Sequence, residues 1–112
     1  MNWNNLESVS QLDIINEESK ALPVMIFKHS TRCSISDMAI NRIQSNWKDT
    51  DSALIKPYYL DIIAHRDISN LITEQYGIEH QSPQVLIISN GECIYHESHT
   101  NIRYNDIMKL AK

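Results

Sequence analysis

Cys33 is the residue whose surroundings point most directly to chemistry. It follows an apolar run from Leu22 to Phe27 and a short polar turn, and it opens a stretch with helical spacing. A cysteine at a helix start lies beside unpaired backbone N–H groups and the positive end of the helix dipole, which favour its thiolate. Arg32 adds a permanent cation next to it. Because the thiolate is the form that attacks disulfides, Cys33 is predicted to be a catalytic nucleophile.

The position three residues after Cys33 limits the disulfide chemistry open to it. A dithiol enzyme carries a second cysteine there, whereas this sequence has Ser36. A hydroxyl does not exchange with sulfur, so a second thiol must come from solution or from another protein. Ser36 is predicted either to hydrogen-bond the thiolate or to serve the first helical turn. The other cysteine, Cys93, is expected to pack within a strand.

Helices and strands alternate along the chain and must position this cysteine. The hydrophobic spacing predicts helices over about 10–19, 33–48, 65–76 and 101–110. Short apolar or alternating runs predict strands over 22–27, 55–61, 84–89 and 92–97. The first two strands are joined through a helix, so they should be parallel with a right-handed crossover.

Several local signals mark the ends and faces of these elements. Ser10 is expected to cap the first helix, with Asp13 at the capping-box position. Gly77 should end the third helix, and Asn90-Gly91 predicts a tight hairpin between the last two strands. Pro57 places its strand at or near a sheet edge. In the second helix, one apolar stripe is expected to face the core and comprises Ile35, Ala39, Ile43 and Trp47.

The predicted order, α-β-α-β-α-β-β-α, is that of the thioredoxin fold. We therefore expect one α/β domain over residues 1–112, with a four-stranded mixed sheet flanked by helices. A ferredoxin-like arrangement is the main alternative, but it needs a hairpin between the first two helices, and none is visible. In the thioredoxin fold a cis proline before the third strand lies beside the nucleophile. The Ser82-Pro83 bond is accordingly predicted to be cis, with Ser82 offering its backbone to an extended substrate.

Composition excludes several other classes of protein. The formal charge of −4 and the absence of a Lys/Arg cluster argue against a nucleic-acid surface. The apolar runs are too short to cross a bilayer, and the N-terminus lacks a basic-then-apolar export signal, so a cytoplasmic location is expected. The five histidines show no metal-binding spacing, so no dedicated metal site is expected.

Residues 28–36, Lys-His-Ser-Thr-Arg-Cys-Ser-Ile-Ser, resemble the active-site segment of the monothiol bacilliredoxins, the YtxJ-like family of the bacillithiol system. Residues 80–86, the Asn90-Gly91 hairpin and residues 95–99 also resemble that family, and the similarity extends across nearly the whole chain. The family usually has proline after its cysteine, where this chain has Ser34.

The resemblance implies a thiol-disulfide oxidoreductase that removes bacillithiol from protein mixed disulfides through one cysteine. Cys33 would be the nucleophile, assisted by Arg32 and Ser36. The residues expected to contact substrate are Thr31, Ser34, Ser82 and Pro83. The partners would be bacillithiolated proteins and a low-molecular-weight thiol, with bacillithiol as co-substrate and no bound cofactor, nucleic acid or membrane.

Two other functions remain open. A glutaredoxin-like iron–sulfur carrier also shows Cys-x-x-Ser, although its motif is Cys-Gly-Phe-Ser and this chain lacks the glycine. A redox-silent thioredoxin-like binding module would require an inert Cys33.

Overall fold

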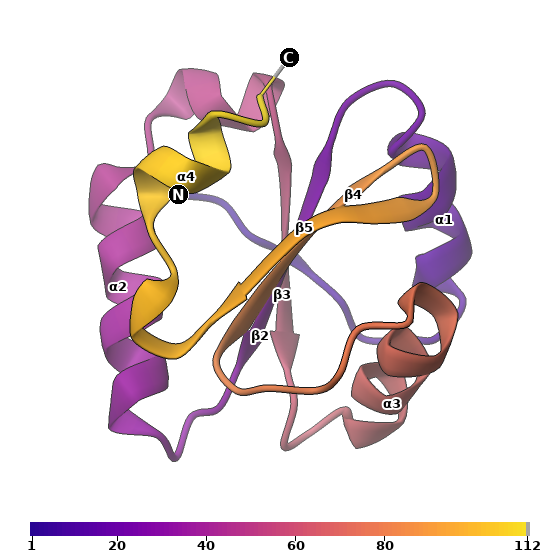
Figure 1. Cartoon of the computed structure of the whole chain (residues 1–112), viewed down its shortest axis with the longest axis horizontal. Coiled ribbons are helices and arrows are strands. Elements are labelled where there is room, and N and C mark those ends of the chain that lie inside the picture. Colours follow the sequence, from indigo (N-terminus) through magenta and orange to yellow (C-terminus); the bar gives the residue numbers. More distant parts are fainter. Residues whose placement is uncertain (112) are drawn as a thin grey trace.

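One mixed β-sheet forms the centre of the computed structural model, which describes residues 1–111 (Figure 1). Its strands lie in the spatial order β1-β3-β2-β4-β5. They are β1 (Asn4–Asn5), β2 (Val24–His29), β3 (Lys56–Asp61), β4 (Gln84–Ser89) and β5 (Glu92–Ser98). The predicted number of four strands was wrong, because the two-residue β1 adds a fifth beside β3.

The central strand β2 pairs in parallel with β3 and antiparallel with β4, as the sequence predicts. Every residue of β2 and β4 is buried, since helices cover both faces of the sheet. Pro57 lies in β3, one strand in from the edge, and its carbonyl accepts a hydrogen bond from the Asn4 side chain at 3.1 Å.

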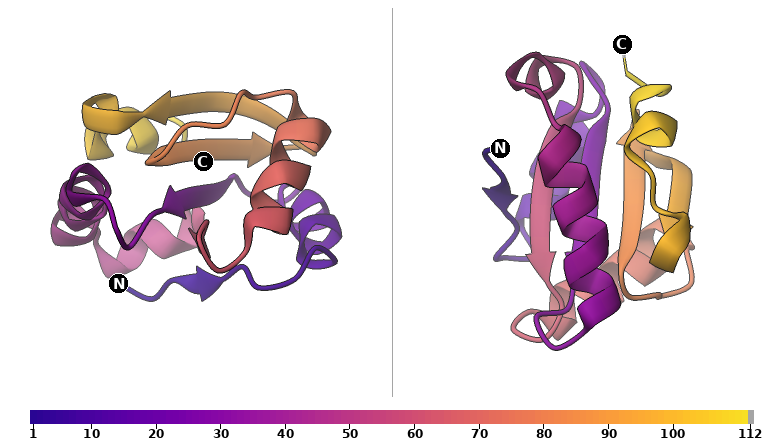
Figure 2. Two further views of the ribbon diagram at one scale, coloured as in Figure 1. Left: turned by 90° about the horizontal axis from the view of Figure 1, so that it is seen from below. Right: turned by 90° about the vertical axis from the view of Figure 1, so that its left-hand side faces the viewer.

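The helices are α1 (Gln11–Glu18), α2 (Ser34–Asn46), α3 (Arg66–Tyr76) and α4 (Tyr104–Met108). Helices α1 and α3 cover one face of the sheet, and α2 and α4 cover the other (Figure 2). Successive residues of a strand point to opposite faces. In β2, Val24 and Ile26 therefore join the core under α1 and α3, whereas Met25 and Phe27 join the core under α2 and α4.

The buried face of α2 differs from the predicted stripe. Ala39 and Ile43 are buried as expected, but Ile35 is 43% exposed. A spacing of four residues advances more than one full turn of a helix with 3.6 residues per turn, so the stripe drifts around the axis. Ser36 and Ile40 complete the buried face instead.

Two predicted helix ends also differ. Ser10 makes no side-chain cap bond; instead, Gln11 Oε1 accepts the N–H groups of Glu7 at 2.6 Å and Ser8 at 2.9 Å. The last helix is much shorter than the predicted 101–110, because Ile102 and the following residue are extended between a 3₁₀ turn (His99–Asn101) and α4. Within residues 1–111, no helix has the length and apolar character needed to cross a membrane.

The hairpin between β4 and β5 turns at Asn90 and Gly91, both with positive φ, at 52° and 75°. This pair of angles matches the tight turn that the Asn-Gly sequence predicts. The turn also contacts the end of α1: Asn90 N–H donates to Ser19 O at 2.9 Å, and Gly91 N–H donates to Ser19 Oγ at 2.8 Å. Ser19 is fully buried where the end of α1 meets the hairpin turn.

Candidate active site

Cys33 lies at the N-terminal cap of α2, as a free and half-buried cysteine. Its backbone is extended, with φ −120° and ψ 118°. Its N–H donates to Ser30 O at 3.2 Å, and its carbonyl accepts the Asp37 N–H at 3.1 Å. These two bonds hold the cysteine at the junction between the polar turn and the first turn of the helix.

The Ser36 hydroxyl lies beneath this junction and is completely buried. Ser36 Oγ accepts the Ser30 N–H at 3.0 Å and lies 2.6 Å from Nδ1 of His29. The other ring nitrogen of His29, Nε2, lies 3.5 Å from Asp37 Oδ1. Ser36 thereby joins the end of β2, the polar turn and the first turn of α2.

The charge of His29 decides the direction of these bonds. Burial lowers the pKa of His29, although the carboxylates of Asp37 and Asp61 act in the opposite direction. When the ring is neutral it has one N–H, which lies on Nε2 and faces Asp37, because a carboxylate can only accept. The Ser36 hydroxyl then donates to Nδ1 of His29. This geometry favours the second prediction for Ser36, a role in the first helical turn.

The peptide bond between Ser82 and Pro83 is cis, as predicted. The sheet register pairs Lys28, near the end of β2, with Gln84 at the start of β4. The cis bond therefore lies at the end of the sheet where β2 stops and the chain continues to Cys33. Pro83 O accepts the His99 N–H at 3.0 Å. Within residues 1–111, the Ser82 hydroxyl is the one buried side-chain polar atom without a hydrogen-bond partner.

The remaining predicted residues lie on the surface around the cysteine. Thr31 and Arg32 precede it in the turn, Ser34 follows it, and all three are exposed. The structure thus brings the turn, the start of α2 and the Ser82-Pro83 segment to one end of the sheet. Cys33 is half-buried among them.

A cluster of polar side chains around Lys28 was not predicted from the sequence. The Lys28 side chain is fully buried, with Nζ 3.3 Å from His80 Nδ1 and 3.5 Å from Ser69 O. Burial lowers the pKa of Lys28 to about 8. Burial is the main cause that lowers the pKa of His80, and the positive charges of Lys28 and Arg66 lower it further. Lys28 therefore connects β2 to the segment that leads into Ser82. The predicted strand ended at Phe27, one residue before Lys28, whereas β2 continues to His29, so the signal that could have revealed the cluster was a lysine directly after the apolar run.

Cys93 lies far from this end of the sheet. It pairs with Ile88, which pairs with Val24 at the start of β2, whereas Cys33 follows the end of β2. The length of β2 alone separates the two ends by about 16 Å at 3.3 Å per residue. The Cys93 thiol donates to Tyr95 O at 3.3 Å, and burial raises its pKa. In the described chain, no three His, Cys, Asp or Glu side chains gather in a way that could hold a metal ion.

Comparison with known proteins gives one family and one fold. The family described as monothiol bacilliredoxin BrxC matches residues 4–107. A solved structure described as a candidate oxidoreductase with a thioredoxin fold is 29% identical, covers 95% of this chain and 90% of its own, and has a TM-score of 0.81. The thioredoxin of Malassezia sympodialis is 18% identical over 96% of this chain and 86% of its own, with a TM-score of 0.68. The thioredoxin of Fasciola hepatica is 10% identical over 95% of this chain and 93% of its own, with a TM-score of 0.72. These structures show the thioredoxin fold.

Proposed function

Because the chain belongs to the monothiol bacilliredoxin family, we propose that it removes bacillithiol from mixed disulfides on protein cysteines. The family and the thioredoxin fold make it a thiol redox protein. The observation that carries the finer proposal is the free, half-buried Cys33 at the start of α2, at the same end of the sheet as the cis Ser82-Pro83 bond. The proposed setting is the cytoplasm, where thiols are kept reduced.

In the proposed reaction, the Cys33 thiolate attacks the bacillithiol sulfur of the client's mixed disulfide. A disulfide forms between Cys33 and bacillithiol while the client's disulfide breaks. The electron pair of that bond leaves with the client sulfur, which takes a proton from water. One disulfide replaces another, so this step needs no external oxidant or reductant. A second thiol then attacks the bacillithiol sulfur and releases Cys33.

The site residues have separate proposed roles. The backbone N–H groups at the start of α2 and the nearby Arg32 favour negative charge on the attacking sulfur. Thr31 and Ser34 are exposed beside the cysteine and contact the client. The backbone around Ser82 and Pro83 pairs with the client's extended segment.

The distance between the two cysteines supports a monothiol mechanism. A disulfide requires the two Cα atoms to lie within about 7 Å, much less than the length of β2. Ser36 stands at the position of a resolving cysteine, and its hydroxyl does not exchange with sulfur. Resolution is therefore assigned to a thiol from outside the chain.

The proposal is tested by intact mass spectrometry after mixing the reduced protein with a bacillithiolated client protein. We expect one adduct of bacillithiol mass on Cys33 and a freed client thiol. Cys33→Ser should abolish the transfer. Cys93→Ser, the matched control, should leave it nearly unchanged, because burial raises the pKa of the Cys93 thiol and reduces its reactive fraction.

Three results would contradict this mechanism. If Cys93→Ser traps the adduct on Cys33, Cys93 is the resolving thiol. If wild-type Cys33 takes up no bacillithiol, the protein is a binding module without redox activity. If anaerobic purification yields a brown protein whose colour depends on Cys33, an iron–sulfur carrier is the better description.

A further inference from the structure

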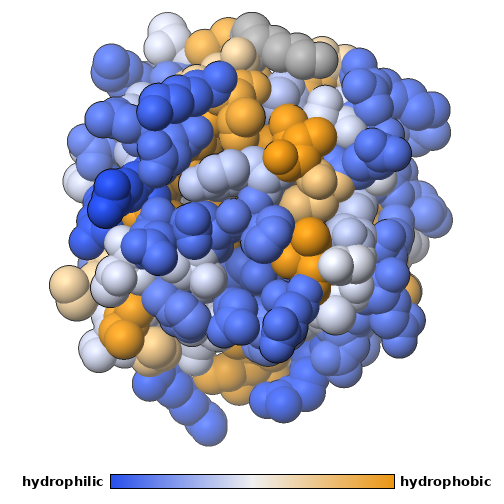
Figure 3. Space-filling view, viewed as in Figure 1, coloured by the Kyte–Doolittle hydropathy of each residue, from blue (hydrophilic) through white to orange (hydrophobic). Residues whose placement is uncertain are grey.

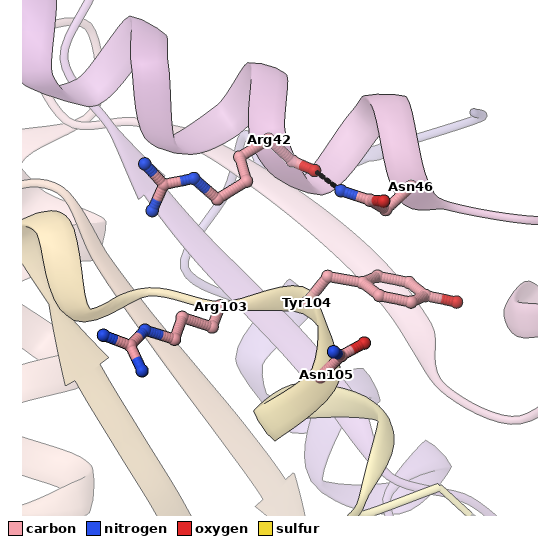
Figure 4. A pocket seen from close by; sticks show the side chains of 5 residues that line it. All are labelled: Arg42, Asn46, Arg103, Tyr104 and Asn105. Carbon is pink, nitrogen blue, oxygen red and sulfur yellow. Dashed lines mark hydrogen bonds between the residues drawn. The ribbon is translucent and has the colours of Figure 1, made fainter.

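A groove made of two separate hollows follows α2 from the neighbourhood of Cys33 toward the far end of the helix. Its near part lies between the first turns of α2 and the 3₁₀ turn after β5, lined by residues that include Ile35, Met38, Arg42 and His99. Its far part, with a volume of about 360 Å³, lies between α2 and α4 and is lined by Arg42, Asn46, Arg103, Tyr104 and Asn105 (Figure 4). Arg42 lines both parts, and its side chain crosses from α2 to Thr100 O and Ile102 O where they meet, so a bound peptide passes over Arg42.

The near part of the groove is apolar and adjoins the active site. Ile35 is 43% exposed and Met38 is 60% exposed, on the outer side of α2. Figure 3 shows apolar side chains over the lower left of the molecule, where α2 begins, within a mostly hydrophilic surface. His99, on the opposite wall, donates its N–H to Pro83 O. A polypeptide bound at the cis proline can therefore pass directly over Ile35 and Met38.

The far part of the groove is cationic. Arg42 Nη1 donates to Thr100 O at 3.4 Å and to Ile102 O at 3.3 Å, which fixes its guanidinium in place and leaves its Nε and Nη2 donors available. The Arg103 guanidinium extends in the same direction from the other wall (Figure 4). Asn46, one turn further along α2, donates its side-chain amide to Arg42 O at 2.8 Å (Figure 4).

These two positive charges have no acidic partner in the part of the chain that the structure describes. The ion pairs there are Lys20–Glu17, His29–Asp37, Lys56–Glu18 and Lys109–Asp106. Two arginines that line one hollow and extend in the same direction offer donors to a carboxylate from another molecule.

The spacing relates this site to the nucleophile. Positions 33 and 42 are separated by about 13 Å along a helix that rises 1.5 Å per residue. An extended peptide covers that length in about four residues. We infer that the groove binds the client segment beside the mixed-disulfide cysteine, with an apolar side chain over Ile35 and Met38 and an Asp or Glu about four residues from the cysteine between Arg42 and Arg103. This inference rests on the proposed function, and it names the class of client segment.

The test uses synthetic peptides that carry bacillithiol on one cysteine. One peptide has Glu four residues before the cysteine, a second has Glu four residues after it, and two matched peptides have Gln. At low salt, we expect one Glu peptide to react about 3- to 10-fold faster than its Gln partner. The advantage comes from the two exposed or partly exposed ion pairs that Glu forms with Arg42 and Arg103. The advantage should shrink as salt is added, because the charges are screened.

Arg103→Glu tests the assignment of the site, because the Arg103 side chain is exposed and its loss leaves the groove wall intact. This variant should remove the preference for Glu and favour a Lys peptide instead. Lys20→Glu makes the same change of charge on an exposed residue of the opposite face and should preserve the preference. The inference is overturned if the Glu and Gln peptides react equally, or if Lys20→Glu acts like Arg103→Glu. Failure of every peptide to exchange with Cys33 would instead contradict the proposed function.

Discussion

A single hydroxyl group, that of Ser36, stabilises the start of the active-site helix. It accepts a hydrogen bond from the Ser30 backbone and lies in hydrogen-bond contact with His29, and it is completely buried. Removal of one partner from a buried hydrogen bond leaves the other group unsatisfied, which costs more than the bond itself contributes. Ser36 is therefore predicted to matter for stability as well as for the chemistry at Cys33.

Ser36→Ala should lower the free energy of unfolding by about 1–3 kcal/mol, because the Ser30 N–H and the His29 ring lose their partner. Ser34→Ala is the matched control, two residues earlier on the same helix and exposed. It should change stability by less than about 0.5 kcal/mol. Urea denaturation of the two variants checks this prediction, and equal stabilities would contradict the role given to Ser36.

At the scale of residues, the sequence predicted those parts of the site that depend on local pattern or on the order of the elements. Cys33 at a helix start was predicted from its neighbours in the chain, and the cis bond before Pro83 was predicted from the thioredoxin fold that the element order indicates. The bonds of Ser36 to His29 and of Lys28 to His80 were not. They join residues whose relative position depends on how β2 packs against other elements, and no spacing in the sequence records that packing.

At the scale of elements, Gly77 ends α3 in the left-handed conformation, with φ at 68°. Its N–H donates to Thr73 O at 3.0 Å. A Cβ added at this position would meet nothing within 4 Å. The only cost of a side chain is therefore conformational, since L-residues avoid this region of φ and ψ.

Gly77→Ala should lower the free energy of unfolding by about 1 kcal/mol. Asn70→Ala, at an exposed position within the same helix, should leave stability unchanged or raise it slightly, because alanine is the better helix former. Thermal denaturation compares the two variants. A neutral Gly77→Ala would mean that the end of α3 rearranges to accept a side chain.

The elements were predicted well where the local signal was complete. The range 84–89 agrees with β4, and 65–76 with α3, because strong apolar runs and clear stop signals mark them. The last helix was predicted too long. Ile102 and Ile107 are both buried, but an extended segment separates Ile102 from α4, and helical spacing does not anticipate it. The two-residue β1 is too short and too polar for any periodic signal, and its pairing with β3 depends on tertiary structure.

At the scale of the whole molecule, the buried Lys28 couples stability to pH. Burial lowers its pKa from 10.5 to about 8 in the folded protein, whereas the unfolded chain keeps the ordinary value. Below pH 8 both states are protonated, and the folded state bears the full cost of the buried charge. Between pH 8 and 10.5 the unfolded state binds more protons, so this group makes stability rise with pH.

Comparison of the wild type with Lys28→Met isolates this contribution from other titrating groups. From pH 7 to pH 9.5, the stability of the wild type relative to the variant should increase by about 2 kcal/mol. Cys93 and the tyrosines titrate in both proteins, so their contributions cancel in the difference. Urea denaturation at the two pH values measures it. A difference that does not change with pH would show that Lys28 keeps its ordinary pKa in the fold.

The contact of Ser19 with the hairpin turn has a consequence for amide hydrogen exchange. In an isolated two-residue hairpin, the N–H groups at the tip face water and exchange rapidly. Here the Asn90 and Gly91 N–H groups are both bonded to Ser19, at the end of a helix that lies about 70 residues earlier in the sequence. These amides can exchange only when the bonds to Ser19 open, so they should exchange more slowly than the tip of an isolated hairpin and report the opening of this contact between the turn and α1.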